Sequence, residues 1–379
     1  MRIRYYVLIP LCLVFGSCRN RTLPDQNDTL SEKKLNYARG FEIRESGNMI
    51  SLCVKNPWQQ AENITYNYWL GKASKPDDEA IPENRYFTVP VKKVVCLSST
   101  FIGFIELLGR EYTIRGVSGK RYVTCASLLN RIASGEVPDV GYDENLNYEK
   151  LVALQPDVVF LYGVTGSVSA VIARLDELGI RSAVIAEYLE ETPLARMEWI
   201  RYIGAFYDLS EEAGICFDSV ETRYNKLAML ASGQHNSPVV MLGLPWSGTW
   251  YVSGGLSYMA RLIHDAGGNY LWKELPYKES QPISPEKVFE RAYNADFWLN
   301  TGDANSKADI LKADNRLGQI KAFREDAIYN NNNLVNKWGG NAYFEQGVVE
   351  PDIILADIIA VLYPHLLPSH QKKYYRKLD

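Results

Sequence analysis

The alternation of short apolar runs with helical segments limits most strongly how this chain can fold. Runs of three to five apolar residues are typical of buried strands, and the intervening segments place apolar residues at helical spacing. In the first half, strands are predicted at residues 94–97, 157–161 and 183–185, and helices at 101–108 and 167–178. In the second half, strands are predicted at residues 239–242 and 297–299, and helices at 257–266, 285–292 and 351–362. Strand–helix–strand alternation predicts an α/β fold of two units with parallel sheets and right-handed crossovers.

The segment between the two units is predicted to be helical. Thr192 and Pro193 supply a helix N-cap and a proline at the first helical position, and apolar residues then recur at helical spacing, interrupted at residues 208–210. No Gly/Ser-rich linker separates the units. The sequence therefore predicts two Rossmann-like lobes, residues 37–192 and 233–379, held at a nearly fixed angle by a long linking helix at 193–232, with a cleft between them.

Residues 41–89 do not continue this pattern. Short apolar runs are broken there by Gly47, Pro57 and Gly71, which favours hairpins over helices. An N-terminal β elaboration of the first lobe is expected.

The N-terminus has the features of a signal peptide. Arg2 and Arg4 precede an apolar run at residues 5–15, which is too short to span a bilayer as a resident helix. Phe15-Gly16-Ser17-Cys18 resembles a bacterial lipobox, so we expect residues 1–17 to be removed and Cys18 to be acylated. An ordinary secretory signal is the alternative. Residues 18–36, which are polar, are expected to form a tether, and the product would be periplasmic and lipid-anchored to a membrane.

Four cysteines remain after Cys18: Cys53, Cys96, Cys125 and Cys216. In an oxidising compartment they allow two disulfides in three connectivities. Buried free thiols are the alternative, and no C-x-x-C spacing indicates a zinc or redox site.

Composition and motifs exclude several functions. The 379 residues include 41 Lys and Arg against 45 Asp and Glu, a net charge of −4 with no long basic run, so no nucleic-acid partner is expected. Only four histidines are present, and no direct metal site is predicted. The chain has no G-x-S-x-G, H-E-x-x-H or P-loop motif, and we expect no catalytic residues and no enzyme. A hydrolase built on the same fold is a weaker alternative.

Ligands of open α/β sheets lie beyond the carboxyl ends of the strands. Aromatic residues dominate the predicted strand ends, where they would stack on a flat or bulky ligand: Tyr162, Trp246, Trp250, Tyr251 and Trp338. Lys120 and Arg121 are candidates for contacting anionic groups of that ligand. The polar stretches 300–303 and 330–338 also follow predicted strands. For the aromatic residues the alternative is a place in the core or on the surface, and for the two basic residues it is solvated surface charge.

Several stretches resemble the helical-backbone class of periplasmic substrate-binding proteins, whose members serve ABC importers of cobalamin and ferric siderophores. They are Asn147 to Val159, Leu178-Gly179-Ile180, Glu198-Trp199-Ile200, Val252 to Gly255 with Asp265 to Gly268, and Gly347 to Asp352. The last is similar to Bacteroidetes-type lipoproteins. The resemblance covers about residues 90–367 of this chain and rests on the order and spacing of these stretches.

The resemblance implies a monomeric lipoprotein that captures a metal chelate, either a ferric siderophore, a cobalamin-type corrinoid or haem, and delivers it to an ABC permease. The protein would hold no cofactor of its own. Similar proteins place a glutamate on top of each lobe to meet the permease, but those positions correspond here to Ser169 and Leu256. Storage of the chelate, or its transfer without an importer, is therefore the alternative function.

Overall fold

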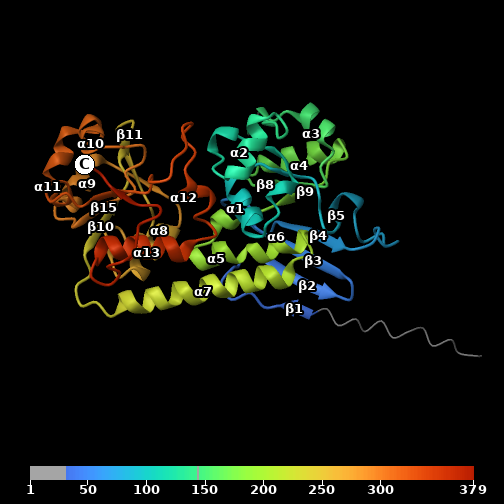
Figure 1. Cartoon of the computed structure of the whole chain (residues 1–379), viewed down its shortest axis with the longest axis horizontal. Helices are drawn as coiled ribbons and strands as arrows, with labels where there is room; N and C mark the ends of the chain where they lie inside the picture. Colours follow the sequence, from blue (N-terminus) through green and yellow to red (C-terminus); the bar gives the residue numbers. More distant parts are fainter. Residues whose placement is uncertain (1–30, 143–144) are drawn as a thin grey trace, which may run out of the picture.

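Two lobes lie side by side in the computed structural model, which describes residues 31–379 except 143 and 144 (Figure 1). The first lobe contains a parallel sheet in the order β7-β6-β8-β9. Its strands are β6 (Val94–Cys96), β7 (Ile114–Val117), β8 (Val158–Leu161) and β9 (Ser182–Val184). Its helices are α1 (Ser99–Leu107), α2 (Ala126–Ala133), α3 (Tyr148–Leu154) and α4 (Val168–Glu177). The three strands predicted in this half are confirmed, whereas β7 was missed because Arg115 and Gly116 interrupt its apolar pattern.

The second lobe repeats this organisation. Its main sheet has the order β13-β10-β15-β16-β17, and all its strand pairs are parallel except β16 with β17. The strands are β10 (Val239–Leu242), β13 (Asn269–Tyr270), β15 (Phe297–Leu299), β16 (Ile328–Asn330) and β17 (Arg376–Lys377). The helices are α8 (Tyr258–Asp265), α9 (Pro285–Ala292), α10 (Lys307–Ala313) and α11 (Lys321–Arg324). The predicted α/β class with two parallel sheets is confirmed.

A small sheet in this lobe was not predicted. The antiparallel strands β11 (Pro245–Trp246), β12 (Thr249–Val252) and β14 (Gln281–Ile283) form it. β11 and β12 are joined by a tight turn in which Ser247 and Gly248 both have positive φ, 47° and 80°. A two-residue turn of this kind matches the twist of a hairpin.

The N-terminal β elaboration is a five-stranded sheet in the order β1-β2-β3-β4-β5. Its strands are β1 (Ser31–Lys33), β2 (Phe41–Ser46), β3 (Met49–Lys55), β4 (Thr65–Gly71) and β5 (Tyr86–Thr88). The prediction that the tether extends to residue 36 is wrong in its last part, because β1 pairs with β2. The buried Glu198 carboxylate also accepts hydrogen bonds from the backbone N–H groups of Asn36, Tyr37 and Ala38, at 2.9, 2.8 and 2.8 Å. Cys18 and the signal segment lie outside the described residues.

Helices α5 (Pro193–Glu198), α6 (Ile200–Phe206) and α7 (Ser210–Ser232) connect the lobes. The linking segment is helical, as predicted, but it is not one continuous helix. The break at Asp208, which has φ of 57°, falls at the predicted interruption, whereas the break at Trp199 was not predicted. Trp199 is held by the Phe41 ring, 4.5 Å between centroids, and donates its indole N–H to Glu190 at 3.0 Å. α7 runs along the base of both lobes, beside α13 (Pro351–Leu362) (Figure 1).

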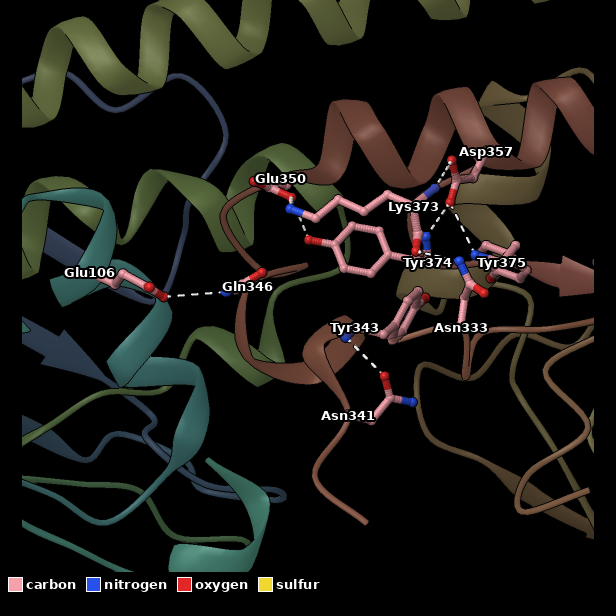
Figure 2. A network of polar contacts seen from close by, with 10 residues as sticks. All are labelled: Glu106, Asn333, Asn341, Tyr343, Gln346, Glu350, Asp357, Lys373, Tyr374 and Tyr375. Carbon is pink, nitrogen blue, oxygen red and sulfur yellow. Dashed lines mark hydrogen bonds and ion pairs between the residues drawn. The ribbon is translucent and has the colours of Figure 1, made fainter. Parts of the chain in front are cut away.

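The chain crosses between the lobes a second time at helix α12 (Ala342–Glu345). Glu345 is fully buried and accepts hydrogen bonds from Thr124 N, Thr124 Oγ1 and Cys125 N of the first lobe, at 2.8, 2.7 and 2.6 Å. Gln346 Nε2 donates to Glu106 of α1 at 3.5 Å, and Figure 2 shows this contact beside the Glu350–Lys373 ion pair. We call these contacts of residues 345 and 346 with the first lobe the bridge.

No described cysteine forms a disulfide. Cys96 and Cys125 are buried, and Cys53 and Cys216 are half-buried free thiols. Burial raises the pKa of Cys125 to about 11, which keeps it a thiol at neutral pH. Of the two alternatives, the structure has the free thiols.

Candidate ligand-binding cleft

A cleft of about 710 Å³ lies where both lobes and α5 meet. Its volume falls within the usual range of small-molecule pockets, roughly 300–1,000 Å³. Five aromatic residues from both sides line it: Trp58, Tyr188, Tyr258, Tyr343 and Phe344. The predicted interlobe cleft therefore exists, and its walls suit a ligand with large apolar or π surfaces.

The N-terminal sheet supplies part of one wall. Residues 56–61, between β3 and β4, fold over the carboxyl end of β8, where Gln59 N donates to Val164 O at 3.2 Å. Positive φ values at Asn56, 44°, and Gln60, 64°, allow the tight turn. The half-buried Trp58 lies there, with its ring 6.3 Å from that of Tyr66. This wall belongs to the β elaboration rather than to the Rossmann-like sheet.

Arg196 of α5 lies between the two lobes. Its Nη2 donates to the carbonyl oxygen of Tyr188 at 2.8 Å, and its guanidinium carbon lies 4.3 Å from the centroid of the Tyr258 ring. This cation–π contact ties a residue of α8 to the first lobe. The Tyr188 hydroxyl donates to Gly163 O at 2.6 Å, and burial raises its pKa to about 12. Both rings are therefore held in place without a ligand.

Two buried glutamates beside this position have different surroundings. Glu190 accepts from the N–H groups of Arg39, Gly40 and the Trp199 indole, so it has a structural role. Glu187 is only 3% exposed and lines the cleft, but its Oε2 has no hydrogen-bond partner. Burial raises the pKa of Glu187, while a hydrogen bond from Thr100 and the charge of Arg196 act in the opposite direction.

The second-lobe wall begins at the N-terminus of α8. The Ser257 side chain caps this helix by accepting from Ala260 N at 3.2 Å, and Tyr258 and Met259 follow in its first turn. The Met259 sulfur accepts from the Tyr343 hydroxyl at 3.2 Å and from Asn300 Nδ2 at 3.5 Å. Phe344, which is 57% exposed, stands edge-on to Tyr343 with 5.2 Å between ring centroids. Polar contacts behind this wall thus fix its aromatic surface.

An ion pair joins the two sides of the cleft. Lys278 of the second lobe pairs with Glu191, which directly precedes the linking helices, and both side chains are about half exposed. Because exposed ion pairs contribute little to the free energy of unfolding, this pair holds the two sides of the cleft together only weakly.

The described residues contain no group of three or more His, Cys, Asp or Glu side chains arranged to hold a metal ion. In the same part of the chain, no helix combines the length and apolar character needed to cross a bilayer.

None of the seven aromatic and basic residues predicted to bind the ligand lines this cleft. Trp250 was wrongly predicted: it is fully buried in the second-lobe core, stacked on Trp298 at 6.0 Å, with its indole N–H donated to Leu242 O at 3.0 Å. Trp246 and Tyr251 lie on the same hairpin as exposed neighbours, 6.5 Å between ring centroids. Inward and outward positions alternate along a strand, so Trp250 and Tyr251 face opposite sides.

The other four residues fall into two places. Lys120 and Arg121 are exposed, and Asn336 Nδ2, on the loop that holds Trp338, donates to Arg121 O at 3.3 Å. This contact connects the lobes near the bridge. Tyr162 lines a separate 490 Å³ hollow of the first lobe, where its hydroxyl lies 3.2 Å from that of Tyr142, and its ring stands 6.1 Å from Tyr188. It therefore lies behind a residue of the cleft wall.

Some cleft residues missed from sequence had a usable signal. Glu187 and Tyr188 follow the strand predicted at 183–185, so the carboxyl-end rule applies to them directly. Asn300, Gly302 and Asn331 do line the cleft and belong to the polar stretches noted after predicted strands. Trp58 and Arg196 gave no such signal, since one lies in an irregular loop and the other within a helix.

The chain belongs to the periplasmic binding protein family, whose model matches residues 94–332, more than half of its length. The resemblance seen in the sequence is thereby confirmed. An uncharacterized lipoprotein of Methanocaldococcus jannaschii is 27% identical over 95% of this chain and 88% of its own length.

Solved structures share the fold. A periplasmic haem-binding protein from Pseudomonas aeruginosa superposes with a TM-score of 0.57 at 17% identity, over 76% of this chain and 98% of that one. A periplasmic solute-binding protein from Veillonella parvula gives a TM-score of 0.57 at 19% identity, over 75% of this chain and 84% of that one. At these identities the likeness establishes the architecture alone.

Proposed function

We propose that this member of the periplasmic binding protein family captures a metal chelate in the interlobe cleft and delivers it to an ABC importer. The observation that supports this most directly is the cleft itself: about 710 Å³, lined by aromatic rings from both lobes that polar contacts already hold in place. Such a site binds flat or bulky ligands at small entropic cost. The ligand class comprises ferric siderophores, corrinoids and haem.

Location is part of the proposal. Acylation of Cys18 would anchor the protein to a membrane on its periplasmic side, in line with a relative named as a lipoprotein. Labelling with a radioactive or clickable fatty acid tests this, and Cys18→Ala should abolish the label.

Binding is tested by titrating the chain without its signal peptide, which keeps every described residue, against cyanocobalamin, haemin and a panel of ferric siderophores. Trp58 lies in the cleft and should report the ligand by fluorescence quenching, with calorimetry as the independent measurement. A saturable one-to-one response at micromolar or tighter affinity supports the proposal. The matched control is Trp58→Phe, which should remove part of the fluorescence response. Silence across the whole panel contradicts chelate capture.

Storage or direct transfer of the chelate is the second candidate function. The observation that favours it is that Ser169 and Leu256, the positions where similar proteins place a docking glutamate, are not acidic, although both are exposed. Measuring ATP hydrolysis by an importer reconstituted in vesicles distinguishes delivery from storage or direct transfer. Stimulation of ATP hydrolysis by the loaded protein supports delivery, and its absence, with binding intact, supports storage or transfer.

A further inference from the structure

The cleft offers little positive charge to an anionic ligand. Of the described residues that line it, two are basic, Arg196 and Lys278. Lys278 is paired with Glu191. Arg196 donates to Tyr188 O at 2.8 Å, lies over the Tyr258 ring and is close enough to Glu187 to affect its ionisation. Both cations are therefore already compensated by groups of the protein.

Negative groups are more numerous. Glu187, Glu190, Glu191 and Glu279 line the cleft against these two bases. Glu190 is occupied by three N–H groups of the protein, and Glu191 by Lys278. Glu279 is exposed at the edge. A ligand with several negative charges would leave solvent for a site without an available partner, which is costly in a partly buried cleft.

One oxygen of the Glu187 carboxyl, Oε2, has no hydrogen-bond partner in the protein, and a ligand would provide one. Glu187 is only 3% exposed and lines the cleft. Its Oε2 accepts no hydrogen bond. A buried polar atom without a partner destabilises the protein, and a ligand donor that reaches it removes this cost. The carboxyl follows β9, at the sheet edge where ligands of this architecture bind.

Building on the proposed function, we infer that the cleft selects a chelate that is neutral or cationic and presents an N–H donor to the Glu187 carboxyl group. Two ligand sources share this chemistry: a corrinoid with amide side chains and a ferric hydroxamate with an ammonium group. The requirement for a neutral or cationic chelate excludes haem, which has two carboxylates. It also excludes a ferric tris-catecholate, which has three negative charges. Glu187 thus determines specificity within the cleft.

The test is calorimetric titration at pH 7.5 with four probes: cyanocobalamin, ferrioxamine B, haemin and ferric enterobactin. At least one of the first two should bind at least tenfold more tightly than either anionic probe. Glu187→Gln keeps the shape but replaces the carboxyl group with a neutral amide, which is a weaker acceptor. Affinity should therefore fall about tenfold for ferrioxamine B and about threefold for cyanocobalamin. Glu290→Gln, the matched loss of charge on the exposed face of α9 outside the cleft, should stay within twofold of the parent chain.

The outcomes separate this inference from the proposed function. If haemin or ferric enterobactin binds most tightly, or if Glu187→Gln binds as the parent does, the inference is overturned while chelate capture stands. If none of the four probes binds, chelate capture fails and the inference fails with it. The ranking of the four probes uses the unaltered protein, so it decides the question even if Glu187→Gln proves unstable in thermal unfolding.

Discussion

The bridge and the cleft, two regions of the interlobe boundary, differ in the hydrogen bonds that their buried glutamates accept. At the bridge, Glu345 accepts three hydrogen bonds from the first lobe, and both of its oxygens have partners. In the cleft, Glu187 is nearly as buried but one oxygen has none. A carboxyl group whose partners all come from the protein holds two parts of the fold together, whereas one that lacks a partner is suited to recognise something that arrives from outside.

The largest expected effect concerns the bridge and pH. Burial is the main cause that raises the pKa of Glu345, from 4.5 to about 7, so the folded protein holds this proton more tightly than the unfolded chain does. Protonated Glu345 therefore contributes to the free energy of unfolding. This contribution is fully present below pH 4.5 and is lost as the pH rises to 7, a change of roughly 3 kcal/mol. Glu345→Gln cannot titrate and should not show this loss.

Urea unfolding of the parent chain and of Glu345→Gln between pH 5 and 8 measures this pH-dependent loss of stability. The free energy of unfolding of Glu345→Gln, relative to the parent, should rise across this range. A difference that stays constant with pH would show that Glu345 does not behave differently from an ordinary surface acid.

The next effect tests how closely the bridge is packed. A Cβ at Gly103 of α1 would lie 2.1 Å from the backbone oxygen of Glu345, which must shift to admit it. Gly103→Ala should lower the free energy of unfolding by about 2 kcal/mol. The control is Gly233→Ala, where the nearest atom is 3.8 Å away. Equal stabilities of the two variants would mean that the backbone at Glu345 shifts to admit the methyl group at no cost in stability.

A smaller effect is expected in the cleft, on affinity rather than stability. Phe344 is exposed and lines the cleft, so Phe344→Ala should weaken binding of the chelate about tenfold, or about 1.4 kcal/mol, and leave the unfolding free energy within about 0.5 kcal/mol. Trp246→Ala removes a ring that is exposed outside the cleft and should not change affinity. Calorimetry on both variants decides, and the reverse ranking would move the site to the β11–β12 hairpin.

The smallest effect is expected from the exposed pair that joins the two sides of the cleft. Lys278→Ala should change the free energy of unfolding by less than about 0.5 kcal/mol, and increasingly less as salt is added. Thermal unfolding at low and high ionic strength measures this. A loss comparable with that of Gly103→Ala would mean that the pair, rather than the bridge, holds the lobes together.

The sequence predicted the architecture far better than the cleft, for a physical reason. Strands such as 239–242 and helices such as 285–292 follow from local apolar patterns and N-caps, and the structure has them at almost the same residues. The cleft is made of residues distant in sequence, such as Trp58, Arg196 and Tyr258, that tertiary packing brings together. Trp246 and Trp250 illustrate the limit: they are four residues apart, yet one is exposed and the other is core, because register across the hairpin decides their burial.

The wall formed by residues 56–61 is a part of the cleft that can be altered separately from the two lobes. The family model matches from residue 94 onward, so Trp58 and its neighbours lie before the matched region. Because this loop carries none of the strands of the two parallel sheets, its residues can be changed while those sheets and the bridge keep their contacts. Exchanging this loop between homologues is accordingly a direct route to re-engineering what the protein binds.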